Sequence, residues 1–139
     1  MRRAVTKKEI YRVVDANYNR AKEGLRVCED VARFVFNDRQ LTARLKRARH
    51  GLTASVQGFG LREIVTAREI RKDVGRKTAG AESDRFSVGD LFYANSQRTK
   101  ESLRVLEEFA KLVNIKAAEK LKRLRYAVYA IEKETLGRV

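Results

Sequence analysis

An internal repeat constrains the fold more than any other feature of the sequence. Residues 16–35 read ANYNRAKEGLRVCEDVARFV and residues 94–113 read ANSQRTKESLRVLEEFAKLV, so eleven of twenty positions are identical at an offset of 78. A second pair of segments, LKRARHGL at 45–52 and LKRLRYAV at 121–128, matches at an offset of 76. Two unrelated amphipathic helices would share leucines and a few charges, but not this set of polar residues in register. The repeat therefore predicts two copies of a helical hairpin, which suit a bundle better than a solenoid.

The rest of the chain supports long helices. The sequence contains no proline, and apolar residues recur at helical spacing. Thr6 and Glu9 form a capping-box pattern that predicts the start of a first helix ending near Phe36. Capping residues and glycines predict four more helices, over about 38–57, 61–72, 87–113 and 114–136. We therefore predict an all-α fold.

The predicted organisation is one domain over residues 1–139, a length typical of a single domain. It is a helical bundle of two pseudo-repeated hairpins, at about 6–57 and 87–136, with a short helix and a long loop inserted between them at about 61–86. The loop spans residues 73–85, and loops of that length in compact domains are usually functional or disordered.

Composition restricts the classes of function. Lysine and arginine number 32 and aspartate and glutamate 18, which gives a net charge of +14. Such a charge suggests an anionic partner, either nucleic acid or a phosphorylated small molecule, or else an ion-paired surface of the heat-adapted kind. One cysteine excludes an internal disulfide, and one histidine disfavours a His-rich metal site. No apolar run reaches the roughly 18 residues of a membrane span, and no signal peptide is evident at the start, so we expect a cytoplasmic protein without membrane contact.

The repeat places polar residues on the inner faces of the predicted helices. A helix advances by about 100° per residue, which puts an asparagine and an arginine of each repeat on or beside the apolar stripe. The second helix of each hairpin adds an arginine among its leucines and valines. These inward residues are Asn17, Arg20, Arg49, Asn95, Arg98 and Arg125.

A charge inside a bundle needs a partner, and two alternatives follow. The arginines pair internally with carboxylates, for which Asp15, Glu23, Glu101 and Glu132 are candidates, or they surround a central site whose ligand supplies the negative charge. Glu29 is placed with Lys22 and Arg26 on the opposite side of the first helix.

Three other features lie near these residues. Cys28 lies on the apolar stripe and is expected to be a packed core residue. His50 lies at the edge of an apolar face and is expected to pack or to form a hydrogen bond. The loop from Gly75 to Gly80 lacks the order of a P-loop, although its backbone N–H groups with Arg76 and Lys77 could cradle a phosphate.

The segment DANYNRAKEGLRVCEDVARF at 15–34 resembles the small all-helical hydroxymethylpyrimidine-phosphate kinase family of thiamine biosynthesis. That family occurs alone or as the N-terminal domain of some bacterial thiamine-phosphate synthases. Glu69 departs from the family pattern, in which an aspartate is expected. The resemblance continues through LKRARH at 45–50, ARE at 67–69, DVG at 73–75, AN at 94–95, ESLRVLEE at 101–108 and LRY at 124–126.

The resemblance implies ATP-dependent phosphorylation of hydroxymethylpyrimidine phosphate to the diphosphate, with ATP and Mg²⁺ as cofactors. Phosphoryl transfer depends on positioning and charge neutralisation, which converging arginines supply. A thiamine-phosphate synthase or a second copy of the chain is a further partner consistent with the resemblance. The expected catalytic residues are Arg20, Arg49, Arg98 and Arg125. The expected substrate- or phosphate-binding residues are Asn17, His50, Arg68, Gly75, Arg76, Lys77, Asn95 and Tyr126. The expected metal ligands are Asp73 and Glu69.

The alternative is a basic helical domain that binds nucleic acid or has a structural role without catalysis. A nucleic-acid-binding helix carries its basic residues on an outer stripe with little acid nearby. Here the outer faces mix lysine and arginine with glutamate, which disfavours nucleic acid as the partner.

Overall fold

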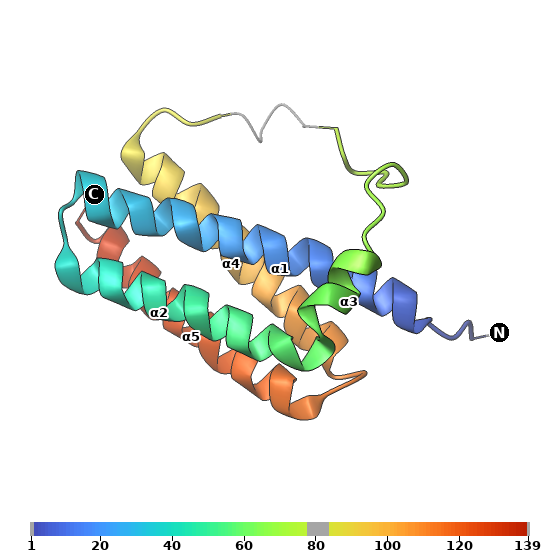
Figure 1. Cartoon of the computed structure of the whole chain (residues 1–139). Coiled ribbons are helices and arrows are strands. Elements are labelled where there is room, and N and C mark those ends of the chain that lie inside the picture. The colour runs from blue at the N-terminus through green and yellow to red at the C-terminus, as the bar shows by residue number, and fades with distance from the viewer. Residues whose placement is uncertain (1, 78–83, 139) are drawn as a thin grey trace.

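The structure is a computed structural model that describes residues 2–77 and 84–138, and these residues form helices joined by turns, with no strand (Figure 1). The predicted all-α fold is therefore confirmed. The helical elements are α1 (Lys7–Asp30), η1 (Val31–Val35), α2 (Arg39–Val56), η2 (Gln57–Phe59), α3 (Leu61–Thr66), α4 (Val88–Ala110) and α5 (Ile115–Leu136).

The four long helices form a bundle of two hairpins. α1 packs against α2 and α4 packs against α5, while α1 also lies along α4 and α2 along α5 (Figure 1). Each long helix contributes a leucine that is at most 1% exposed: Leu25, Leu45, Leu103 and Leu121. Cys28 belongs to this core as expected, and burial raises the pKa of its thiol to about 12. None of the described helices is long and apolar enough to cross a membrane.

The helix starts follow the predicted capping residues. The Thr6 hydroxyl accepts a hydrogen bond from the Glu9 backbone N–H, and the Glu9 carboxylate accepts one from the Thr6 N–H. The Thr6 N–H and the Arg3 guanidinium together lower the pKa of Glu9 to about 2. Side-chain oxygens of Asp38, Ser87 and Asn114 cap α2, α4 and α5 in the same way.

The helix predicted over 61–72 is shorter than expected, because α3 ends at Thr66. The Thr66 hydroxyl donates to the Arg62 carbonyl at 2.8 Å, and beyond Ala67 the chain turns so that Arg68 reaches α1. Residues 67–77 then form turns, bends and irregular chain that lead into the long predicted loop. Residues 78–83, which include the Gly80 end of the predicted phosphate cradle, lie outside the described residues.

α1 and α4 approach each other closely at Gly24. A Cβ atom at this position would lie 2.9 Å from the Asn95 carbonyl oxygen and would also collide with the Thr99 hydroxyl. Glycine is therefore required for this helix contact, which brings the Arg20 and Arg98 regions of the repeat to neighbouring surfaces. The two-fold relation of the hairpins remains a prediction.

Candidate functional site

The four arginines that were predicted to point inward fall into two pairs with different surroundings. Arg49 Nε lies 3.0 Å from Glu29 Oε1, and Arg125 Nη2 lies 3.0 Å from Glu107 Oε1. Both glutamates are buried. Arg49 and Arg125 therefore follow the internal-pairing alternative, and their role at an anion site remains a prediction.

The pairing carboxylates differ from the predicted ones. Glu29 was placed on the solvent side of α1, but α1 packs against α2, α3 and α4, so its buried arc is wider than its apolar stripe. Glu29 and Glu107 are identical residues at the 78-residue offset, as Arg49 and Arg125 are at 76. Because both members of each ion pair recur in the repeat, the repeat could have identified these two pairs.

Arg125 is additionally held by an aromatic neighbour. Its Nη1 donates to the Tyr129 hydroxyl at 3.0 Å. Burial alone would lower the pKa of Arg125, but the hydrogen bonds to Tyr129 and Glu107 outweigh burial and raise it. Arg125 is therefore a charged and fully partnered structural residue.

Arg20 and Arg98 are exposed, contrary to the prediction that they lie inside the bundle. They lie at the edge of the apolar stripe, where the long side chain reaches solvent. Arg20 has one long hydrogen bond, from Nη1 to Asn17 Oδ1 at 3.4 Å. Within residues 2–77 and 84–138, neither arginine forms an ion pair with a carboxylate.

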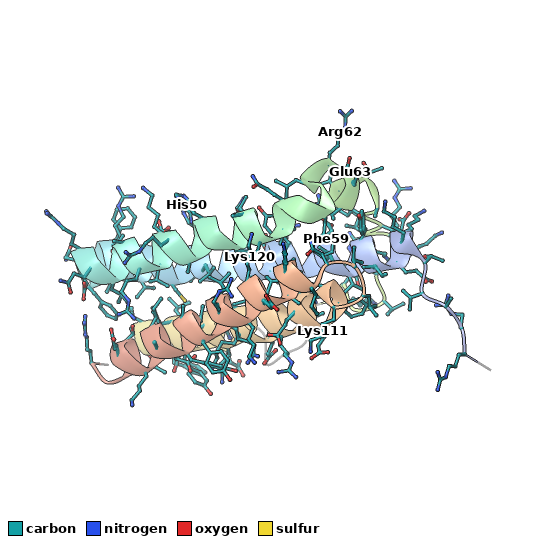
Figure 2. All side chains as sticks on the ribbon, turned by 90° about the horizontal axis from the view of Figure 1, so that it is seen from below. His50, Phe59, Arg62, Glu63, Lys111 and Lys120 are labelled. Atoms are coloured by element: carbon teal, nitrogen blue, oxygen red, sulfur yellow. The ribbon has the colours of Figure 1, made fainter. Side chains whose placement is uncertain are left out.

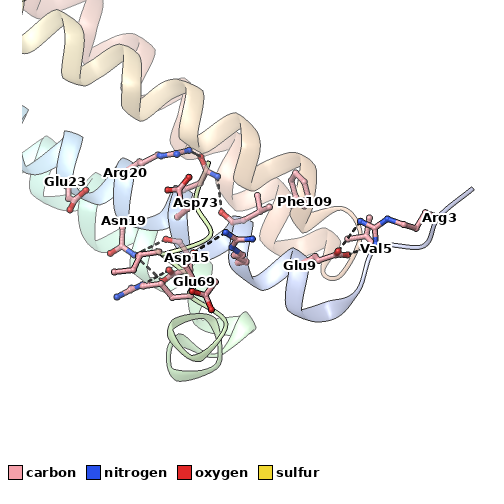
Figure 3. A pocket seen from close by; sticks show the side chains of 16 residues that line it. Arg3, Val5, Glu9, Asp15, Asn19, Arg20, Glu23, Glu69, Asp73 and Phe109 are labelled. Atoms are coloured by element: carbon pink, nitrogen blue, oxygen red, sulfur yellow. Dashed lines mark hydrogen bonds and ion pairs between the residues drawn. The ribbon is translucent and has the colours of Figure 1, made fainter. Parts of the chain in front are cut away.

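Arg20 lines a pocket of about 860 Å³ that we call the α1 pocket (Figure 3). One wall is the face of α1 from Arg12 to Glu23. The other walls are the N-terminal residues from Arg3, the segment from Arg68 to Asp73, and Phe109 of α4. The pocket therefore exists because the chain after α3 returns to α1.

Two arginine contacts hold that segment against α1. Arg68 Nε and Nη2 donate to the two carboxylate oxygens of Asp15 at 2.7 and 2.8 Å, and this hydrogen-bonded pair raises the pKa of Arg68. Arg12 Nη2 donates to the Glu69 carbonyl oxygen at 3.1 Å. Arg68, which was predicted to bind phosphate, is thus engaged by a buried carboxylate and shapes the pocket wall.

The pocket is electrically mixed. It is lined by four arginines and five carboxylates. Two ion pairs join Arg3 to Glu9 and Arg68 to Asp15. Among the residues that the structure describes, the charged lining side chains with no ion-pair partner are the cations Arg12 and Arg20 and the carboxylates Glu23, Glu69 and Asp73.

The pocket also has an apolar part to its lining. Val13, Ile70 and Phe109 line the same pocket. The lining therefore offers arginines to an anionic group, carboxylates to a hydrogen-bond donor and an apolar surface to a flat ring.

The structure brings five of the predicted site residues together in the α1 pocket: Asn17, Arg20, Arg68, Glu69 and Asp73. The Asp73 carboxylate accepts a hydrogen bond from the Gly75 N–H at 3.0 Å. The described part of the chain contains no group of three or more metal-ligating side chains, and a metal role for Glu69 and Asp73 remains a prediction.

The other predicted residues do not line this pocket. His50 is exposed on α2 (Figure 2), and Tyr126 is exposed on α5 beside Arg125. Asn95 donates to the Leu91 carbonyl at 2.8 Å within its own helix. Arg98 lines a different pocket, described below. The remaining predicted residues outside the α1 pocket are Arg49, Gly75, Arg76, Lys77 and Arg125.

Arg12 and Phe109 are among the lining residues that sequence reasoning missed. Arg12, Ala16 and Arg20 are spaced by four residues, which places them on one helix face and could have identified Arg12. Phe109 had no comparable indication, because its position depends on how α4 crosses α1.

Comparison with known proteins adds the family. Residues 12–134 match the model of the ThiD2 family. The chain belongs to the ThiD2 family. A thiamine-phosphate synthase from Nostoc punctiforme is 39% identical over 129 residues, which cover 92% of this chain and 36% of the relative. A thiamine-phosphate synthase from Synechocystis sp. is 41% identical over 129 residues (92% and 36%), and one from Rhodopirellula baltica is 37% identical over 126 residues (90% and 34%).

This ThiD2 chain therefore spans about a third of the length of the curated relatives that it matches. No solved structure matches it. The expected similarity to thiamine-phosphate synthases is confirmed.

The predicted activity is wrong. The relatives are named thiamine-phosphate synthase, which is a different class of enzyme from a hydroxymethylpyrimidine-phosphate kinase. The nucleic-acid-binding alternative finds no support in these relatives either. The residues that carried the resemblance lie mostly on α1 and α4, where many of them belong to the core or line the pockets, and such residues indicate a shared fold more directly than a reaction.

Proposed function

We propose that this chain takes part in the synthesis of thiamine phosphate and binds a phosphorylated pyrimidine precursor in the α1 pocket. One observation carries the proposal. In a chain related to thiamine-phosphate synthases, Arg12 and Arg20 have no carboxylate partner among the described residues and line a pocket that also has an apolar lining.

The ligand chemistry suits this lining. The Arg20 guanidinium binds the phosphate through paired N–H donors, as guanidinium groups commonly do. The ring lies against Val13 and Phe109, and its amino group donates to the carboxylate of Glu69 or Asp73. The volume of about 860 Å³ falls in the usual range for a small-molecule site.

The same proposal assigns the chain a place beside a synthase. The match covers only 36% of the Nostoc punctiforme relative, so most of that synthase corresponds to nothing in this chain. We propose that the helical bundle holds the pyrimidine precursor while a synthase part forms thiamine phosphate.

Titration calorimetry tests the binding claim. 4-Amino-5-hydroxymethyl-2-methylpyrimidine phosphate is titrated into the full chain, with the unphosphorylated pyrimidine as the control ligand. We expect one phosphorylated ligand per chain and at least about 10-fold weaker binding of the control, since a charge-assisted contact is lost. Equal affinity for the two ligands, or no binding of either, would contradict the proposal.

A growth experiment tests the pathway claim. Deletion of the gene in its native host should create a requirement for added thiamine. The wild-type gene should relieve this requirement, and a gene carrying Arg20→Gln should relieve it poorly. Normal growth of the deletion strain without thiamine would overturn the proposed role.

A further inference from the structure

A second pocket adjoins the α1 pocket. It has a volume of about 430 Å³ and lies between α1 and α4, and we call it the α4 pocket. Asn17 and Arg20 line both pockets. The two pockets therefore share a wall, and the guanidinium of Arg20 belongs to that wall.

The α4 pocket is built from the repeat counterparts of α1-pocket residues. Ala16, Asn19, Arg20 and Glu23 line the α1 pocket, and each has a counterpart 78 residues later in the α4 pocket. These counterparts are Ala94, Gln97, Arg98 and Glu101. The same helical face thus forms a pocket twice, once on α1 and once on α4.

Charge distinguishes the two pockets. The α4 pocket is lined by two arginines, Arg20 and Arg98, and by one carboxylate, that of Glu101. The α1 pocket is lined by four arginines and five carboxylates. The α4 pocket therefore has an excess of positive charge, whereas the α1 pocket does not.

Both arginines of the α4 pocket are available to a ligand. Arg98 is exposed and forms no ion pair with any residue in 2–77 or 84–138. Arg20 has only its long hydrogen bond to Asn17. By contrast, neighbouring Arg104 on α4 is paired with Glu108 at 3.1 Å.

We propose that Arg98 and Arg20 form a subsite for a second phosphoryl group, next to the phosphate that the α1 pocket holds. The inference rests on the proposed function, because Arg20 contacts both groups. The second group is either the far phosphoryl group of a diphosphate that spans the shared wall, or the phosphate of a second ligand. Two arginines that line one pocket and form no ion pair among the described residues suit such an oxyanion.

Inorganic pyrophosphate and inorganic phosphate are the probes. They are titrated into the wild type, Arg98→Gln and the matched control Arg104→Gln, in buffer at near-physiological salt. We expect the wild type and Arg104→Gln to bind pyrophosphate at least about 10-fold more tightly than phosphate, or to bind two phosphates. Arg98→Gln should remove that preference or one of the two phosphates. Tighter binding of pyrophosphate than of phosphate indicates a site that spans a diphosphate. Binding of two phosphates indicates sites for two separate ligands.

Unchanged pyrophosphate affinity and unchanged phosphate stoichiometry in Arg98→Gln would overturn the subsite. That result together with normal binding of the pyrimidine phosphate would leave the proposed function standing. Conversely, Arg98-dependent pyrophosphate binding without any binding of the pyrimidine phosphate would support the anion subsite and reject the proposed substrate. Circular dichroism of each variant confirms that the helices are intact.

Discussion

Two pairs of repeated arginines occupy corresponding places in the two hairpins and have opposite surroundings. Arg49 and Arg125, on α2 and α5, are each held by a buried glutamate of the preceding long helix. Arg20 and Arg98, on α1 and α4, are exposed, and among the described residues no carboxylate pairs with either of them.

The difference follows from the cost of leaving a charge alone. An unpaired charge in the interior costs several kcal/mol, so a bundle that buries arginine must also bury its partner. An exposed arginine is solvated and remains free for a ligand. The repeat therefore encodes two kinds of arginine, one that stabilises the hairpins and one that is available at the pockets.

The largest expected loss of stability comes from breaking the buried ion pair of Arg125 and Glu107. Glu107→Ala leaves Arg125 without its carboxylate at a site where both side chains are less than 10% exposed, and should lower the free energy of unfolding by about 3 kcal/mol. Urea denaturation followed by circular dichroism measures the loss. The control Glu108→Ala removes an exposed carboxylate from the same helix and should cost less than about 0.5 kcal/mol. Equal losses in the two variants would contradict a structural role for Arg125.

The corresponding loss in the free energy of unfolding should be smaller in the first hairpin. Glu29→Ala removes the partner of Arg49, whose side chain is 16% exposed and can gain some solvation, so we expect a loss of about 2 kcal/mol. The same denaturation experiment applies. A loss larger than that of Glu107→Ala would reverse the order that burial predicts for the two hairpins.

Arg68 lies between the two kinds of arginine. Its partner Asp15 is buried, but the Arg68 side chain is 43% exposed, so solvent screens the pair. Arg68→Gln should lower the free energy of unfolding by about 1 kcal/mol and should weaken ligand binding by loosening the segment from Arg68 to Asp73. If stability is unchanged while binding is lost, Arg68 contacts the ligand directly, as the sequence alone suggested.

The smallest expected loss of stability comes from the exposed pair of Arg3 and Glu9. The pKa of Glu9 falls from 4.5 to about 2 on folding, so its contribution to stability is complete above pH 4.5 and is lost as the pH falls toward 2. The thermal unfolding midpoint of Glu9→Gln should therefore lie below that of the wild type at pH 7, and the two should converge near pH 2. A difference that grows on acidification would contradict this assignment.

Much of the fold could be predicted from the sequence. The capping residues Thr6, Asp38, Ser87 and Asn114 begin the four long helices as expected, because capping is a local interaction. The end of α3 could not be predicted in this way. It lies just before Arg68, whose contact with Asp15 joins residues 53 positions apart in the sequence.

The candidate site could be predicted in part. Helical geometry selected Arg20 and Arg98 for the ligand but also selected Arg49 and Arg125, because angular position on one helix does not show which neighbour a side chain meets. Glu29 lies only 120° from Asn17 by helical geometry, and packing of α2 on that flank buries it. The predicted reaction was wrong because the residues that carried the resemblance build the fold and the pocket, and such residues do not specify the chemistry.

The central claim is that Arg20 is free to bind the phosphate of the ligand. Its most direct test is calorimetric titration of two proteins, wild type and Arg20→Gln, with two ligands, the hydroxymethylpyrimidine phosphate and the unphosphorylated pyrimidine. Arg20→Gln should weaken binding of the phosphorylated ligand by about 10-fold or more and leave the unphosphorylated ligand within about twofold, since only the first loses a charge-assisted contact. Equal changes for the two ligands, or no change for either, would contradict it.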